Sequence, residues 1–464
     1  MRTDTIVAAA TAMGNSGIGI IRVSGDDSIE IVNRIYKNKR NQSCLKDYES
    51  NTIHYGFLYD GCELIDEVMV SVMKKPFSFT TEDTVEINCH GGMLVMNRIL
   101  ELLINRGGRL AEPGEFSKRA FLNGRIDLTE AEAVMDLISS RNELALKNSI
   151  KQLRGEIYHS IAEYRKEIIH EIAFIESALD DPEHISLDGY SVSLENKIDD
   201  LINKIEGLLS TTEKGKMIRE GINTVIVGKP NAGKSSLLNS LTGEERAIVT
   251  DIAGTTRDAL EEDIRLGEIN LHIIDTAGIR STEDVIEKIG VEKAKKLAKE
   301  AELIIYVVDS SVPLDENDSE IIDMIENKKC IILFNKSDLD SEISFDELKN
   351  RLQPELKEDL FIIKTSLKKN TGIEEFENAV KELFIKGKIS SDNEIIITNM
   401  RHKEALKNAL ESLLMVKKSL QANMPEDFFS IDLMEAYRCL GKVIGEEIEE
   451  DLINEIFSSF CMGK

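Results

Sequence analysis

Short runs in which apolar and polar residues alternate fill the first part of the chain, and Gly-containing turns separate them. Four runs have the length and the β-branched content of strands: Thr5–Ala10, Ile18–Val23, Glu67–Met73 and Thr84–Cys89. We therefore expect a compact α+β domain over residues 1–118.

The spacing of apolar residues changes to a helical period from Arg119 onward. Leu128–Arg141 and Asn142–Ser177 predict long helices, and Asp180–Ser193 predicts a loop. Glu213–Glu220 reads as a short charged linker, and the helical period returns after Asn399 and continues to residue 464. The pattern predicts an all-α helical domain made of two segments, 119–216 and 386–464.

Between these segments, apolar runs alternate with helical patterns, which is typical of a parallel sheet covered by helices. The expected strands are Thr224–Val227, Leu271–Asp275, Leu303–Asp309, Cys330–Asn335 and Leu360–Lys364. Residues 217–385 are thus predicted to form an α/β domain inserted into the helical domain.

A phosphate-binding motif begins this inserted domain. Gly228–Ser235 matches G-x-x-x-x-G-K-[ST] between a predicted strand and a predicted helix at Ser236–Leu241. Backbone N–H groups of such a loop surround phosphates, Lys234 reaches the β- and γ-phosphates, and Ser235 binds Mg²⁺. The residues expected to contact the nucleotide here are Asn231, Ala232, Gly233, Lys234, Ser235 and Ser236. The alternative is an ordinary Gly-rich turn.

Three further motifs follow in order, and strands of the inserted domain end at or before them. The D-x-x-G motif supplies Asp275, Thr276, Ala277 and Gly278, the N-K-x-D motif supplies Asn335, Lys336 and Asp338, and the next loop supplies Ser366, Leu367 and Lys368. The Asp338 carboxylate can accept hydrogen bonds from guanine N1–H and the 2-amino group, which adenine lacks, and backbone N–H groups of residues 366–368 can meet guanine O6. Ligands bind at this edge of open parallel sheets, so the sequence predicts a P-loop GTPase domain.

The residue after D-x-x-G does not match the usual water-orienting glutamine of GTPases. Ile279 follows D-x-x-G where many GTPases carry a water-orienting Gln. The side-chain oxygen of Asn231 could instead bind a monovalent cation beside the phosphates, or it could only stabilise the turn. Between the phosphate motifs, a loop is expected to act as switch I; it contains Thr250, Asp251, Ile252, Ala253, Gly254, Thr255 and Thr256.

Composition narrows the setting of this activity. The six cysteines are scattered without a Cys-x-x-Cys pair, and neither a signal-peptide pattern nor a long apolar run is present, so we expect a cytoplasmic protein without a membrane segment. The net charge of −27 disfavours broad nucleic-acid binding. Any RNA role would then need a local patch or a basic partner.

Together these residues resemble the MnmE (TrmE) family of tRNA modification GTPases over the whole chain. The motifs shared with many GTPases are Gly228–Ser236, Thr250–Asp258 and Asp275–Arg280. Those specific to the family are Asp4–Ala8, Gly19–Gly25, His90–Gly92, Ala111–Ser117, Arg119–Gly124 and the tail Phe460–Lys464.

The resemblance implies a homodimeric GTPase that works with an FAD-dependent partner, MnmG (GidA), in a hetero-oligomer. The complex would install an aminomethyl-type group (carboxymethylaminomethyl) on C5 of the wobble uridine of certain tRNAs, using 5,10-methylene-tetrahydrofolate (or 5-formyl-tetrahydrofolate) held by the N-terminal domain. GTP, Mg²⁺ and K⁺ are the implied cofactors of the G domain, which would dimerise in its GTP state.

Individual roles are also carried over by this resemblance. The implied K⁺ ligands are Asn231, Thr250, Ile252 and Thr255, the Mg²⁺ ligands are Ser235 and Thr256, and Glu287 would orient the attacking water. The folate contacts would be Arg22, Glu86, Arg125 and Lys464; the family also has Lys at the third of these positions.

Two questions stay open at this level. Cys461 is either a packing residue of the terminal helix or a nucleophile placed at the folate pocket. The main alternative function is a ribosome-assembly or RNA-binding GTPase of the Era or Der type, although the chain shows neither a Gly-x-x-Gly loop after the G domain nor a second G domain. The tail Cys461–Lys464 fits a prenylation signal poorly.

Overall fold

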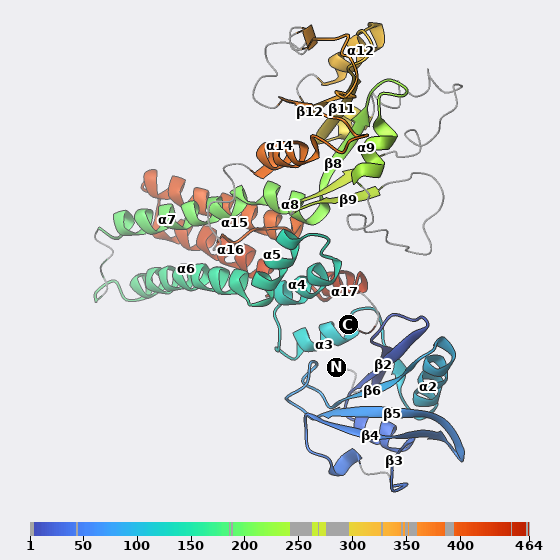
Figure 1. Ribbon diagram of the computed structural model, residues 1–464. Helices are drawn as coiled ribbons and strands as arrows, with labels where there is room; N and C mark the ends of the chain where they lie inside the picture. Colours follow the sequence, from blue (N-terminus) through green and yellow to red (C-terminus); the bar gives the residue numbers. More distant parts are fainter. Residues whose placement is uncertain are drawn as a thin grey trace. The chain divides into compact units, whose positions relative to one another are not determined.

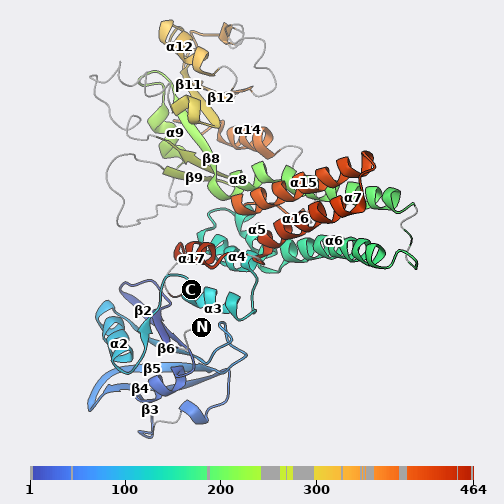
Figure 2. The same ribbon diagram turned by 180° about the vertical axis from the view of Figure 1, so that it is seen from behind.

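The computed structural model describes residues 4–42, 45–184, 186, 189–241, 262–267, 269–274, 297–325, 328–344, 347–348, 351, 360–385, 394–446, 448–460 and 463. The chain divides into two compact units (Figures 1 and 2). Unit 1 comprises Met1–Met135, Gln152–Ser186 and Glu426–Lys464, and unit 2 comprises Asp136–Lys151 and Leu187–Pro425. The boundaries of the three expected domains remain a prediction.

A seven-stranded sheet forms the N-terminal part of unit 1. Its strands lie in the order β3 (Tyr36–Asn38), β4 (Thr52–Asp60), β5 (Glu63–Met73), β6 (Thr84–Gly91), β2 (Ser16–Ser24), β1 (Ile6–Ala9) and β7 (Arg109–Leu110). All neighbours are antiparallel except β1 and β7. The four expected strands are confirmed, and β3, β4 and β7 complete the sheet.

One face of this sheet is buried because every second strand residue is apolar. Val23, Val70 and Ile87 point into a core that also contains Met96 and Ile99 of α2 (Met93–Asn105). Helix α1 (Ser28–Asn33) and the 3₁₀ turn η1 (Leu45–Asp47) add to the same core. The sheet is therefore covered by helices on that side.

The rest of unit 1 is helical. Its elements are α3 (Glu115–Leu122), the first part of α4 (Leu128–Ser139), α6 (Glu156–Asp180), α16 (Glu426–Ile444) and α17 (Glu450–Ser458). Helices α6 and α16 lie side by side in both views (Figures 1 and 2). The single helix expected at Asn142–Ser177 is wrong: α5 (Glu143–Leu153) and α6 are separate, because Gly155 adopts φ 77° between them.

Unit 2 contains the expected parallel sheet. Its order is β13 (Leu360–Lys364), β12 (Lys329–Asn335), β11 (Leu303–Asp309), β8 (Ile222–Val227), β10 (Ile269–Ile273) and β9 (Glu262–Leu266). The first five strands are parallel to their neighbours, and β9 pairs antiparallel with β10 at the edge. The predicted strands are confirmed, with Asp275 lying outside the described residues; β9 was not expected.

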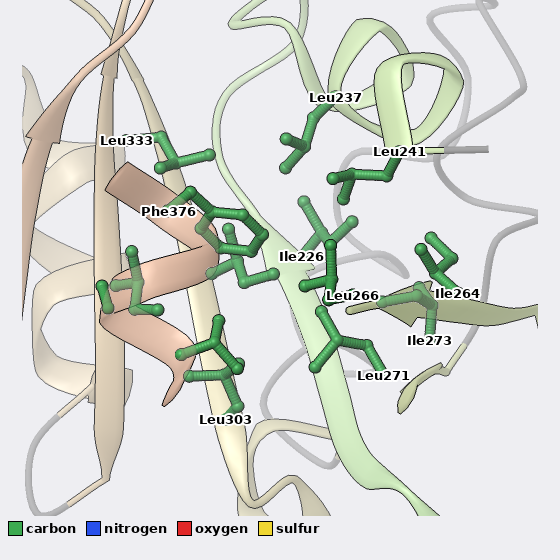
Figure 3. Close-up of a cluster of buried hydrophobic side chains, with 14 of the residues drawn as sticks. Ile226, Leu237, Leu241, Ile264, Leu266, Leu271, Ile273, Leu303, Leu333 and Phe376 are labelled. Atoms are coloured by element: carbon green, nitrogen blue, oxygen red, sulfur yellow. The ribbon is translucent and has the colours of Figure 1, made fainter. Parts of the chain in front are cut away.

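Helices cover both faces of this sheet. Leu237 and Leu241 of α9 (Lys234–Leu241) and Phe376 of α14 (Ile373–Ile385) pack on one face against Ile226 and Leu271 (Figure 3). Ile322 and Ile325 of α12 (Glu316–Ile325) belong to the core on the opposite face. Both faces are buried, which explains the continuous apolar runs of β11 and β12.

Three more helices belong to unit 2: α7 (Tyr190–Ser210), α8 (Thr212–Glu220) and α15 (Met400–Gln421). The Asn399 side chain caps α15 by accepting a hydrogen bond from the Arg401 N–H at 2.9 Å. The linker expected at Glu213–Glu220 is wrong, because this charged segment is α8. Gly215 of α8 has no room for a side chain, because a Cβ there would lie 2.0 Å from the Ile397 carbonyl oxygen. Among the described residues, no helix has both the length and the apolar character needed to cross a membrane.

Candidate functional site

The phosphate-binding loop lies between β8 and α9, as its motif requires. Gly228 adopts φ 150°, and a Cβ there would approach the Val307 carbonyl oxygen to 2.4 Å. Gly233 adopts φ 114°, and a Cβ there would come within 2.2 Å of Asn335 Nδ2. Both glycines are thus required by backbone angle and by space.

Lys234 holds the loop closed from inside. Its Nζ donates to the carbonyl oxygens of Gly228, at 2.6 Å, and Lys229, at 2.8 Å. Burial lowers the pKa of the Lys234 ammonium. A phosphate at the N-terminus of α9 would supply the negative charge that these neutral carbonyls lack.

Asn231 is exposed at the outer bend of the loop with φ 59°. Asn is among the few side chains that tolerate this left-handed conformation, so the residue suits the turn. Cation binding by the same side chain is compatible with its exposure and stays a prediction.

Asn335 joins the phosphate-binding loop to the loop expected to hold guanine. Its Nδ2 donates to the Ala232 carbonyl at 2.8 Å, and its Oδ1 accepts from the Leu367 N–H at 3.2 Å. The side chain is buried, at 3% exposure. We name this arrangement the Asn335 brace; the motif predicted Asn335 as a nucleotide residue but not this connection.

The carboxylate expected to bind guanine accepts a hydrogen bond from a neighbouring side chain. Ser366 Oγ donates to Asp338 Oδ1 at 2.7 Å, and this hydrogen bond lowers the pKa of the Asp338 carboxyl. The carboxylate therefore stays ionised and acceptor-only near neutral pH. Lys336 adopts φ 62° and pairs through its ammonium with Asp309 at the end of β11.

The Ser366–Lys368 loop has one open amide. The Ser366 N–H donates to the Thr371 carbonyl and the Leu367 N–H to Asn335. Within the described part of the chain, the Lys368 N–H makes no such bond. Ser235 and Ser236 lie in the first turn of α9.

Several expected site residues lie outside the described residues. These are Thr250, Asp251, Ile252, Ala253, Gly254, Thr255, Thr256, Asp275, Thr276, Ala277, Gly278, Glu287, Cys461 and Lys464. Their roles remain predictions.

A second group of charged residues gathers in unit 1. Arg22 on β2 and Glu86 on β6 are cross-strand neighbours, with Arg22 Nε donating to Glu86 Oε1 at 2.8 Å. Arg22 Nη1 donates to the Gly463 carbonyl of the tail at 3.1 Å. The guanidinium carbons of Arg22 and Arg125 lie 5.9 and 4.9 Å from the Phe79 ring centroid. We call these five residues the Arg22 cluster; it unites three of the four predicted folate contacts.

Phe79 is the member that sequence reasoning missed, because no motif marks it. Its loop is built by polar contacts: the buried hydroxyls Thr80 Oγ1 and Ser24 Oγ are 2.6 Å apart, and Asn123 Nδ2 donates to the Thr80 carbonyl at 2.7 Å. The next residue, Thr81, has φ 61°, which is rare for a β-branched residue. These contacts hold the loop that carries Phe79 beside the guanidinium groups of Arg22 and Arg125.

Two family models match the chain. Residues 5–125 match the family model "GTP-binding protein TrmE N-terminus", and residues 128–461 match the model "MnmE helical domain". The second match alone spans more than half of the chain. The chain belongs to the MnmE family.

Curated MnmE proteins resemble the chain from end to end. The tRNA modification GTPase MnmE of Lachnoclostridium phytofermentans is 53% identical over 464 residues, with 100% of both chains covered. The MnmE proteins of Acetivibrio thermocellus and Alkaliphilus oremlandii are 48% and 46% identical, covering 100% and 99% of both chains. Membership of the MnmE family sets aside the Era-type and Der-type alternatives.

Proposed function

We propose that this chain, a tRNA modification GTPase by family, is a K⁺-dependent GTPase that acts with an FAD-dependent partner of the MnmG (GidA) kind. The complex installs a carboxymethylaminomethyl-type group on C5 of the wobble uridine of certain tRNAs. GTP hydrolysis drives dimerisation and rearrangement of the G domains and is not the modification chemistry itself. The observation that carries the GTPase part is the Asn335 brace, which joins a phosphate loop to a guanine-specific loop.

The residues of the G domain divide the work as follows. Lys234 and the N-terminus of α9 bind phosphates, and Asp338, oriented by Ser366, selects guanine. Mg²⁺ would be held by Ser235 and Thr256, and K⁺ by Asn231, Thr250, Ile252 and Thr255. K⁺ would supply the positive charge that an arginine supplies in other GTPases. Glu287 would orient the attacking water.

The Arg22 cluster fits a folate. A pterin ring has N–H groups that can donate hydrogen bonds to a carboxylate such as Glu86. Its flat faces can stack on the Phe79 ring. The glutamate carboxylates of a folate suit the guanidinium of Arg125 and the ammonium of Lys464. A 5,10-methylene- or 5-formyl-tetrahydrofolate would supply the one-carbon unit, and Cys461 follows Phe460 in the tail that reaches this cluster.

Exposed apolar side chains on one face of the unit 1 sheet support a homodimer. Ile53, Tyr55 and Met69 project from β4 and β5 on the face opposite to Val68 and Val70 of the buried core, and they are 61%, 45% and 51% exposed. Apolar groups gathered on one exposed sheet face favour association with a second copy.

The partner makes most of the contacts with tRNA, because the net charge of −27 on this chain repels the phosphate backbone. We place the protein in the cytoplasm, where tRNA is modified. Tight tRNA binding by the isolated chain at physiological salt would contradict this division of labour.

Reconstitution tests the proposal directly. The chain, the flavoprotein, unmodified tRNA, methylene-tetrahydrofolate, glycine as the source of the carboxymethylamino group, Mg²⁺ and GTP are combined in KCl, and the nucleosides are analysed by mass spectrometry. We expect a mass gain at the wobble uridine that is lost without GTP or without folate. Glu86→Gln should weaken folate binding, measured by equilibrium dialysis, while GTP hydrolysis is unchanged. Full modification without GTP would contradict the proposed coupling.

A further inference from the structure

The side chain of Lys229, the second residue of the phosphate loop, reaches the start of α12. Its Nζ lies 2.7 Å from Asp318 Oδ2 and 3.1 Å from Asp315 Oδ2, at the N-terminus of α12. It also reaches the Pro313 carbonyl at 3.4 Å. The phosphate loop is therefore tied by a side chain to the loop that follows β11.

The acceptor of this lysine is a buried carboxylate. Asp318 is 1% exposed, and its Oδ1 accepts from the hydroxyl of Tyr306 at 2.7 Å. Its Oδ2 also accepts from the Asp315 N–H at 2.9 Å, in return for an Asp315 side-chain bond to the Asp318 N–H. A buried carboxylate is stable only when it is paired and fully hydrogen-bonded, and these partners meet that need.

Tyr306 places the far end of this chain of contacts directly beside the phosphate loop. It is fully buried on β11 and is the strand partner of Val227, the last residue of β8 before the loop. A rigid sheet position thus fixes Asp318, and Asp318 fixes Lys229.

Holding the Lys229 side chain also fixes the position of the Lys229 main chain within the phosphate loop. Its carbonyl oxygen accepts from Lys234 Nζ, the ammonium expected to meet the β- and γ-phosphates. Moving Lys229 would move this carbonyl and the N–H groups that follow it.

We propose that Lys229, Asp318 and Tyr306 form an anchor that pre-organises the phosphate loop for nucleotide, with Lys229 and Asp318 as positioning residues for guanine-nucleotide binding. The anchor contacts the loop and not the γ-phosphate, so it supports GDP and GTP equally. Losing it removes uniform binding, which raises KM and leaves kcat unchanged. The inference rests on the proposed GTPase function.

The test uses the full-length chain and titrates fluorescent N-methylanthraniloyl-GDP and the matching GTP analogue. Lys229→Met should raise both dissociation constants about tenfold, the scale of ordering one loop before binding. Lys229→Arg keeps a cation that can reach both carboxylates, and it should stay within about twofold of wild type. Lys299→Met, at an exposed lysine of the same unit, is the matched control and should change nothing.

Lys229→Met leaves the buried Asp318 carboxylate without its cation, which is itself destabilising. The double variant Lys229→Met/Asp318→Asn therefore removes both charges of the pair and gives a second chain without the anchor. It should show the same tenfold loss for both nucleotides, an unchanged kcat at saturating GTP and an unchanged ratio of rates in KCl and NaCl. Wild-type nucleotide affinity in a folded double variant would overturn the anchor proposal and leave the proposed GTPase function standing. A wild-type chain that binds no guanine nucleotide would overturn the proposed function as well.

Discussion

Replacing Asn335 by alanine should separate the phosphate loop from the guanine loop without changing any residue that is expected to touch phosphate. The side chain is 3% exposed and makes two bonds no longer than 3.2 Å, one to each loop. Asn335→Ala removes both and leaves the Ala232 carbonyl and the Leu367 N–H without these partners.

The expected magnitude follows from those two bonds. A hydrogen bond contributes about 1 kcal/mol net, so local stability of the two loops should fall by roughly 2 kcal/mol. Because 1.4 kcal/mol is a factor of ten, about 30-fold faster local opening is expected. GDP affinity should fall by a similar factor, since both halves of the site are then positioned separately.

Hydrogen exchange of the full-length protein, followed by mass spectrometry, measures this opening. Peptides containing Leu367 and the phosphate loop should exchange about 30-fold faster in Asn335→Ala, while peptides from the unit 1 sheet are unchanged. Asn317→Ala, at an exposed asparagine near the start of α12, is the control and should behave as wild type. Unchanged exchange near Leu367, together with unchanged GDP affinity, would refute the brace.

Three further outcomes are expected. The hydrogen bond that protonated His90 donates to the Asp66 carboxylate raises the pKa of His90. The stabilising contribution of this pair is therefore complete below about pH 6.5, the unfolded value, and is lost as the pH rises through the higher folded value. His90→Gln should flatten the change in Tm between about pH 5.5 and pH 8.5, and a slope equal to wild type would exclude this pair as its source. Gly463→Val should release the tail, because Gly463 has φ 89° and a Cβ there would lie 2.2 Å from the Ala9 carbonyl oxygen. Proteolysis of the C-terminus should be faster and folate binding about tenfold weaker, and a tail that stays protected would contradict its docking on Ala9. Ile87→Ala should cost about 2–5 kcal/mol of stability in the unit 1 core with GTP affinity unchanged; denaturant midpoints measure the loss, and altered GTP affinity would show that the core and the nucleotide site are linked.

Strands β1, β2, β5 and β6 of the unit 1 sheet and every strand but β9 of the unit 2 sheet were predictable, because alternation and continuous apolar runs record which faces are buried. Strands β3, β4, β7 and β9 were not expected. The positions of Lys234 and Asp338 after strands β8 and β12 were predictable because their motifs stand at fixed places relative to strand ends; their contacts with nucleotide stay a prediction. Patterns of this kind reflect local geometry, which a sequence carries directly.

Contacts between distant segments were not predictable. Asn335 bonds to Ala232 and Leu367 only once the four strands β8, β11, β12 and β13 are in register. Phe79 meets Arg125 only through a loop built by buried hydroxyls. Helix α8 was mistaken for a linker because charge hides its few buried residues. Gly155 ends a helix through its backbone angle, which no apolar pattern reveals.

Steady-state GTP hydrolysis in KCl and in NaCl, at matched ionic strength, tests the central claim most directly. The proposed function predicts strong acceleration by K⁺ over Na⁺ in the wild-type chain and loss of that difference in Asn231→Ala. Equal and slow hydrolysis in both salts would contradict a cation-dependent GTPase and would indicate a switch that needs another activator.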